Sequence, residues 1–151
     1  YSTQSSVGIV RQGEIKMDVK EIMNPKYWMI GIGSLMLVMS VFGVMDGEQM
    51  ASDMWGADNV AEHDAEYEEM WALNMMPLFA MFVVIGLLAK GKTLAQLTMA
   101  ASAFSITFMG VGMMLLTSDS GYGGESSTLM FIIVGTAALL GISGFLHKDG
   151  E

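Results

Sequence analysis

The residues of this sequence best suited to chemistry lie in one acidic segment, Glu62 to Glu69, which contains a histidine. Carboxylate and imidazole groups are ligands for divalent cations such as zinc and manganese. On a helix, four of these side chains would share one face: Glu62, His63, Glu66 and Glu69. A metal needs three or four converging ligands, whereas a run with one histidine and many carboxylates also suits the solvated start of a helix. We therefore expect no bound metal. The alternative is a metal site in which these four residues are the ligands.

Methionine is a second source of ligands, because the chain has 17 and thioether sulfur binds copper. Methionine is also a flexible apolar filler of helix contacts, and the sequence has no cysteine to share a metal. The sequence also lacks a P-loop, a dinucleotide fingerprint and a Ser/His/Asp pattern. We therefore expect structural methionines, no cofactor and no enzymatic activity.

The elements that must position these residues are four runs without Asp, Glu, Lys or Arg, at residues 27–45, 70–89, 93–118 and 126–147. About 20 apolar residues cover the ~30 Å hydrocarbon core of a bilayer. Charged residues make up only 15% of the chain, against roughly 25% in soluble domains. The sequence thus predicts an all-α fold, a four-transmembrane-helix bundle.

Charge is segregated between the connections of these runs. Every Lys and Arg lies before the first run, between the second and third, or after the fourth, while the other two connections hold eleven carboxylates. The positive-inside rule then places both termini in the cytoplasm. We expect a cytoplasmic tail with a short amphipathic helix at residues 1–24, and a transmembrane domain at 25–148 with an acidic extracytoplasmic loop at 46–69. The expected location is the plasma (inner) membrane of a prokaryote, and no basic surface suits nucleic acid.

Local signals predict where the helices begin and end. Asn24-Pro25 should open the first helix with a cap followed by proline, and Asp46-Gly47 should end it in a left-handed turn. The spacing of Asn59 and Glu62 matches a capping box that would start the second helix. Gly91 should supply a left-handed conformation in the short turn before the third helix.

Small residues predict where the helices pack, since they let backbones approach closely in a membrane. The residues we assign to packing are Gly31, Ser102, Ser105, Gly112, Gly135, Ala137, Gly141 and Gly144. Within the last helix we expect Gly141 at a helix crossing and its neighbour Leu140 toward lipid.

The architecture resembles that of the small DoxX-like membrane proteins. The resemblance rests on residues 31–43, on the basic turn Leu87-Leu88-Ala89-Lys90-Gly91-Lys92 and on the Gly121-Tyr122-Gly123-Gly124 segment. The chain departs from the family in having Pro77 in its second helix and no Arg near the outer end of its third. The resemblance implies a four-helix fold and a link to quinol oxidase complexes for some members.

From these patterns we expect a structural or accessory membrane subunit that acts through helix–helix contacts, as a homo-oligomer or within a larger complex in the lipid bilayer. Two alternatives stay open. One is an oligomeric channel or transporter, because the acidic outer loops would concentrate cations. The other, implied by the resemblance, is a quinone-linked redox accessory protein.

Overall fold

The fold is all-α throughout the part of the chain that the computed structural model describes, residues 19–123 and 127–150, with the side chains of residues 127–130 left out. The helices are α1 (Val19–Ile22), α2 (Pro25–Met45), α3 (Gly47–Trp55), α4 (Asp64–Leu88), α5 (Gly91–Phe104), the π-helical η1 (Ser105–Gly112), α6 (Met113–Thr117) and α7 (Ser127–Leu146).

Three helical segments are long and apolar enough to cross a membrane: Val19–Met45, Asp64–Leu88 and Gly91–Thr117. A fourth apolar segment, Phe131–Leu146, is shorter. The chain is therefore a multi-pass membrane protein. Of the predicted N-terminal amphipathic helix, Val19–Ile22 is helical, and the remainder lies outside the described residues.

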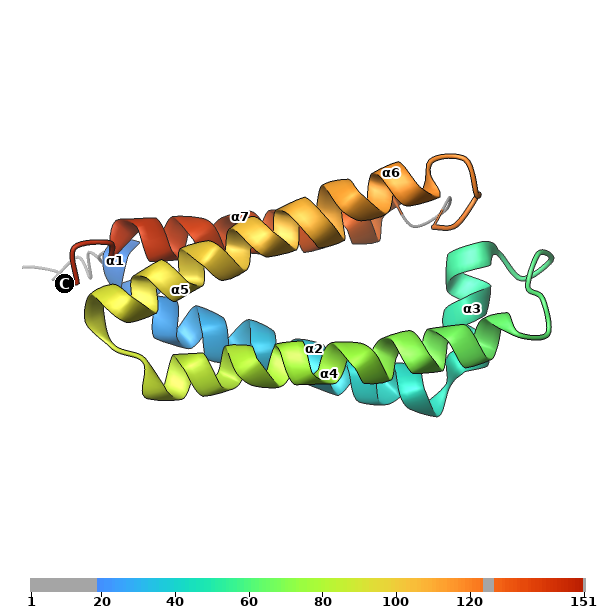
Figure 1. Ribbon diagram of the computed structural model, residues 1–151, viewed down its shortest axis with the longest axis horizontal. Coiled ribbons are helices and arrows are strands. Elements are labelled where there is room, and N and C mark those ends of the chain that lie inside the picture. Colours follow the sequence, from blue (N-terminus) through green and yellow to red (C-terminus); the bar gives the residue numbers. More distant parts are fainter. Residues whose placement is uncertain (1–18, 124–126, 151) are drawn as a thin grey trace, which may run out of the picture.

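The long helices form two layers of antiparallel helices (Figure 1). One layer pairs α2 with α4, and the other pairs the continuous rod α5–η1–α6 with α7. Glycines allow close contact within each layer. A Cβ at Gly33 of α2 would lie 2.9 Å from the Phe79 carbonyl of α4, and one at Gly144 of α7 would lie 2.8 Å from the Ala95 carbonyl of α5.

The predicted start of α2 and the left-handed conformation of Gly91 are confirmed. The Asn24 side chain accepts a hydrogen bond from the Lys26 amide at 3.0 Å, and Pro25 is the first helical residue of α2. Gly91 has a φ of +52°, which an L side chain rarely adopts, and it turns the chain from α4 into α5. Gly91 was expected to cap the second membrane helix, but the extended residue Ala89 ends α4, and Gly91 is the first residue of α5.

The predicted left-handed cap at Gly47 is wrong. The Asp46 side chain instead accepts from the Gln49 amide at 3.3 Å and starts a new helix, α3, of which Gly47 is the first residue. A Cβ at Gly47 would lie 2.6 Å from the Ala65 carbonyl of α4. Glycine is thus needed here for a helix contact, and the connection at residues 46–69 contains α3 and the first turns of α4.

The predicted start of the second membrane helix is also wrong, because α4 begins at Asp64 rather than near Asn59. The Asn59 amide donates to the Trp55 carbonyl at 3.3 Å, which ties it to the end of α3. The residue before α4 is His63, whose side chain makes no capping hydrogen bond, and the Asp64 carboxylate accepts from the Ala61 amide of the preceding connection at 2.7 Å.

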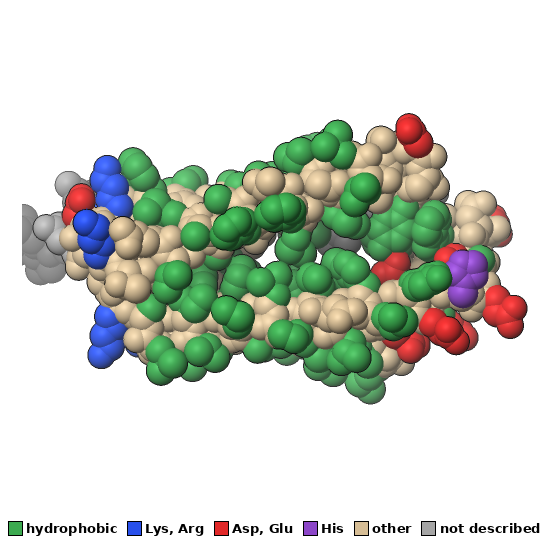
Figure 2. All heavy atoms as spheres, in the orientation of Figure 1, with side chains coloured by type: hydrophobic (Ala, Val, Ile, Leu, Met, Phe, Trp, Pro, Cys, Tyr) green, Lys and Arg blue, Asp and Glu red, His purple; other side chains and the backbone are tan. Residues whose placement is uncertain are grey.

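The two layers meet through an apolar cluster near one end of the molecule. Each of four helices supplies one buried residue of this cluster: Met29, Phe82, Leu94 and Leu140. We call this the lysine end, because Lys26, Lys90, Lys92 and Lys148 lie near the start of α2, around the turn from α4 to α5 and after α7. Lysine side chains gather at this end in Figure 2, and we call the opposite end, with α3 and the first turns of α4, the acidic end. Leu140 is only 1% exposed, so the expectation that it faces lipid is wrong.

Between the two ends, the surface is hollowed between the layers toward the acidic end, and hydrophobic side chains border this interlayer hollow (Figure 2).

Candidate functional site

The acidic segment does not bring its four predicted ligands onto one face. Because α4 begins at Asp64, both Glu62 and His63 precede the helix, while Glu66 and Glu69 lie on it. The His63 Nε2 atom lies 3.6 Å from the Asp64 carboxylate, and its ring makes an edge contact with Tyr67. Among the described residues, no three His, Asp or Glu side chains come together in a group that could hold a metal ion.

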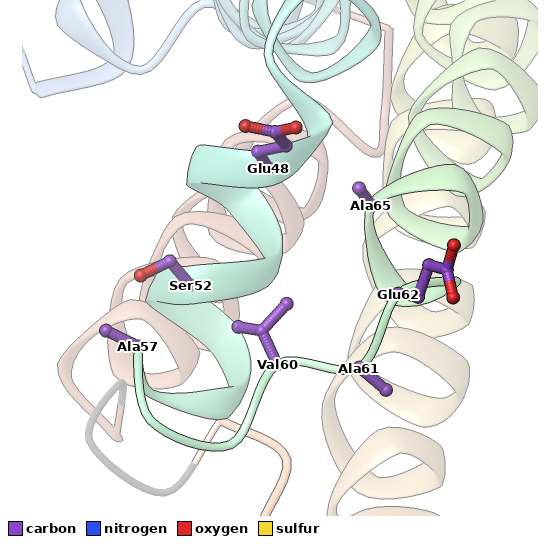
Figure 3. Close-up of a pocket in the computed structure, with 7 residues that line it drawn as sticks. All are labelled: Glu48, Ser52, Ala57, Val60, Ala61, Glu62 and Ala65. Atoms are coloured by element: carbon purple, nitrogen blue, oxygen red, sulfur yellow. The ribbon is translucent and has the colours of Figure 1, made fainter.

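An open cavity of about 430 Å³ lies between α3 and the start of α4. Two carboxylates line it, Glu48 of α3 and Glu62 of the connection. Figure 3 shows that Val60 points into the space between the two helices, whereas the Glu62 carboxylate points away from α3. The two carboxylates therefore do not converge on one point.

The acidic end is closed by a contact between Glu68 and Tyr122, which are far apart in the sequence. The Tyr122 hydroxyl donates to the Glu68 carboxylate at 2.8 Å, and Glu68 is only 5% exposed. The Trp55 ring packs edge-on against Tyr122 at 5.0 Å, and the Gly123 amide donates to the Met54 carbonyl. The connection after α6 is thereby fastened to both α3 and α4.

Burial changes the acid–base behaviour of this pair, which lies outside the membrane span because the charge-free part of α4 begins at Met70. Desolvation raises the pKa of Glu68 above its ordinary value; the hydrogen bond from Tyr122 opposes this, and the charge of Asp64 adds to it. Desolvation also raises the pKa of Tyr122, and the hydrogen bond to Glu68 and its charge act in the same direction. Tyr122 is therefore a neutral donor at physiological pH.

Sequence reasoning missed this contact. Tyr122 stands in a Gly/Ser-rich connection, and Glu68 stands in a run of carboxylates, so neither is distinguished by its neighbours. The only signal was a lone aromatic residue in a polar connection between two apolar runs. Its partner could be identified only once the two layers were placed.

The residues assigned to helix packing fall into two groups. Four lie where α5 meets α7: the Ser102 hydroxyl donates to the Ala137 carbonyl at 2.6 Å, a Cβ at Gly141 would meet Ser102, and Gly144 lies against α5. The other four are not at a close contact between helices. Gly31 and Gly135 face open space, and Gly112 lies over the Thr107 carbonyl of its own helix. Ser105 is half-buried at the start of η1.

The third membrane segment contains the most unusual backbone in the protein. Eight residues, Ser105–Gly112, are π-helical. π-Helical turns are rare in proteins, and many of those that occur lie at functional sites. The Thr107 carbonyl would lie 3.3 Å from a Cβ at Gly112, so the glycine leaves room for the wide turn. Only 11% of the most apolar stretch of this segment is buried, against 22% for each of the first two.

An exposed face of α5 and η1 carries small and polar residues in place of large apolar ones. Five residues at spacings of three or four form this α5 stripe: Thr93, Gln96, Ala100, Ala103 and Thr107. Beside it runs an apolar ridge in which the rings of Phe104 and Phe108 stack at 6.1 Å. The Gln96 amide makes no hydrogen bond to any of the described residues.

Comparison with known proteins found no relative of this chain: no protein-family model, no curated protein and no solved structure matches it. The resemblance to DoxX-like proteins therefore gives no family assignment.

Proposed function

We propose that this protein is a structural or accessory membrane subunit that associates with a second copy of itself through the α5 stripe. The observation that carries the proposal is the exposed Gln96 amide on a stripe of small residues, in the segment that its own chain buries least. An amide facing hydrocarbon without a partner is costly, and small residues are what membrane helices use to approach each other.

A second copy suits this surface better than a different helix does. Two copies inserted with the same orientation place α5 at the same depth, so a twofold axis brings Gln96 opposite its counterpart. The amide has both donor and acceptor atoms, so two glutamines satisfy each other. Gln96 lies five residues into α5, roughly 8 Å along its axis. The small residues Ala100 and Ala103 follow on the same face, where they would let the two helices approach.

Disulfide cross-linking tests this arrangement directly, because the chain has no cysteine of its own. Ala100→Cys and Ala103→Cys in native membranes should each give a dimer on mild oxidation. The matched control is Leu35→Cys, which lies on an exposed face of α2 and should not cross-link. Dimer from the control in equal yield would mean random collision, and no dimer from either α5 variant would refute the proposal.

A second arm of the test separates the amide from general packing. Gln96→Leu should weaken self-association by about tenfold, as expected for one intramembrane hydrogen bond. Asn74→Leu is the control, since the Asn74 amide already donates to the Met70 carbonyl of its own helix at 2.8 Å. If both variants associate like the unaltered protein, Gln96 does not hold the interface. If Ala100→Cys instead forms a disulfide with a different membrane protein, the partner at the α5 stripe is a subunit of a larger complex and not a second copy of this chain.

The proposed orientation places the lysine end, with both termini, in the cytoplasm and the acidic end outside a prokaryotic plasma membrane. The segregation of lysine and carboxylate between the two ends supports it (Figure 2). Single cysteines at Ser52 and Ser120 should react with an impermeant reagent on intact cells, and one at Gly91 should not. Labelling of Gly91→Cys from outside would reverse the topology.

A second candidate function, a quinone-linked redox accessory, is favoured by the interlayer hollow, which hydrophobic side chains border (Figure 2). A quinone ring and its isoprenoid tail would suit such a space. Extraction of purified protein with organic solvent, followed by chromatography for quinones, tests it. Retention no greater than that of a bulk membrane protein of similar size would reject this candidate.

A further inference from the structure

The lysine end contains a cavity of about 260 Å³ that the proposed function does not use. Residues from the start of α2, the end of α4, the turn into α5 and the end of α7 line it. The cavity thus lies where the apolar helices reach the membrane surface. It is several times larger than the ~30 Å³ share of a water molecule, so a phosphate group fits within it.

The polar side chains of this cavity are cationic or can donate hydrogen bonds. Lys26 comes from α2, Lys90 from the turn and His147 from the end of α7, while none of the described residues that line the cavity carries a carboxylate. Neither lysine forms an ion pair with any described carboxylate. Two ammonium groups that favour an anion therefore line the cavity from separate parts of the chain.

His147 is oriented by its own helix. Its Nδ1 atom lies 3.0 Å from the Ser143 carbonyl, and because a carbonyl oxygen only accepts, Nδ1 carries the hydrogen of this bond. The Nε2 atom is therefore left for another partner. A group that binds here meets two ammonium ions and an imidazole edge.

The remaining walls are apolar. Pro25, Leu87 and Leu94 line the same cavity, and Leu94 also belongs to the apolar cluster that joins the two layers. A ligand with a phosphate next to hydrocarbon satisfies both kinds of wall. Basic pockets between membrane helices on the cytoplasmic side bind the headgroups of anionic lipids in this way.

We infer that this cavity binds a phosphate ester, with Lys26 and Lys90 holding the anionic oxygens. The ligand chemistry is that of an anionic phospholipid headgroup, and a free phosphate shares it. The site is independent of the α5 stripe, so it holds whether or not the chain forms a dimer.

The test uses the purified full chain in neutral detergent, with bound lipids counted by native mass spectrometry and thermal stability followed in parallel. The probes are dioctanoyl phosphatidylglycerol, dioctanoyl phosphatidylcholine and inorganic phosphate. Phosphatidylglycerol should bind with one preferred stoichiometry and raise the melting temperature, whereas phosphatidylcholine should do neither. An equal effect of inorganic phosphate would identify a free phosphate as the ligand.

Matched double variants distinguish a built site from diffuse attraction. Lys26→Gln/Lys90→Gln removes the two lysines of the cavity, and Lys92→Gln/Lys148→Gln removes the same charge from the same end. The control lysines do not line the cavity, and Lys148 lies 4.5 Å from the Phe145 ring. The first pair should weaken binding by about tenfold or more, and the second pair should change it much less.

All four lysines are exposed, so both double variants should fold, and circular dichroism checks that they do. Equal losses from the two pairs would show general electrostatic attraction and overturn the site. Binding unchanged in Lys26→Gln/Lys90→Gln would overturn it as well.

Discussion

The two ends of the molecule join the same two layers by opposite means. At the lysine end, buried side chains from α2, α4, α5 and α7 meet in an apolar cluster. At the acidic end, the contacts between described residues that connect the layers are polar and aromatic: the hydrogen bond between Glu68 and Tyr122, the ring contact of Tyr122 with Trp55, and the backbone hydrogen bond from Gly123. The first kind of contact depends on shape and volume, and the second depends on geometry and protonation.

This difference indicates which end opens more easily. Apolar burial is spread over many small contacts, so no single hydrogen bond controls the lysine end. Among the described residues, the acidic end depends on a few polar contacts, so loss of one affects the whole junction. We therefore expect the layers to separate first at the acidic end, and the following variants test this.

The largest effect should come from Leu140→Ala at the lysine end. Removing a buried leucine from a packed cluster should lower the free energy of unfolding by about 2–5 kcal/mol. The control is Leu139→Ala, whose side chain is 42% exposed on the same helix and should cost far less. Unfolding in mixed micelles with increasing sodium dodecyl sulfate measures both, and equal losses would show that the cluster does not hold the layers together.

Tyr122→Phe at the acidic end should have the next largest effect. It leaves the Glu68 carboxylate buried without its donor, which should cost about 1–3 kcal/mol. Tyr67→Phe is the control, because the Tyr67 side chain is exposed. Limited proteolysis of the 118–127 connection should become faster in Tyr122→Phe only. Unchanged proteolysis would mean that the ring contact with Trp55 and the hydrogen bond from Gly123 to Met54 close this end without the Tyr122 hydroxyl.

Stability should depend on pH through Glu68. The pKa of Glu68 in the folded state is raised above its ordinary value of 4.5, so the folded state binds more protons than the unfolded state between these two pKa values. The contribution of Glu68 to the free energy of unfolding therefore falls as the pH rises through this interval. In Glu68→Gln, the side-chain oxygen still accepts from Tyr122 but does not titrate. The difference in stability between Glu68→Gln and the unaltered protein should therefore grow from pH 4 toward pH 7, and a constant difference would contradict a titrating Glu68.

The smallest effect should be a gain, from Ser143→Ala at the lysine end. The Ser143 hydroxyl is fully buried and has no hydrogen-bond partner among the described residues, so removing it should raise stability by up to about 1 kcal/mol. Ser102→Ala, which breaks the hydrogen bond to Ala137, should instead lower stability. Melting temperatures in detergent compare the two, and a loss in Ser143→Ala would point to a partner for the hydroxyl in the membrane.

The sequence by itself determined which segments of this protein are apolar helices and where some of them begin and turn. Long apolar runs have one stable form in a membrane, the helix, because each backbone amide must be satisfied within its own segment. Local chemistry likewise set the cap at Asn24 and the left-handed turn at Gly91. These features depend on neighbours within a few residues, which the sequence displays directly.

The tertiary structure decided which face of each helix is used. Leu140 and Leu139 are adjacent and chemically identical, yet one is buried between layers and the other is exposed. Gly141 packs against Ser102, whereas Gly31 faces open space. In a membrane both lipid-facing and buried positions are apolar, so hydrophobicity does not distinguish them.

The same reason explains the candidate sites. The segment Glu62 to Glu69 was expected to offer a single face, but α4 begins within it, at Asp64, so Glu62 and His63 lie outside the helix. The pairing of Glu68 with Tyr122 and the convergence of Lys26, Lys90 and His147 join residues far apart in the chain. Such contacts exist only after the layers are stacked, because nothing local to any one of these residues specifies its distant partner.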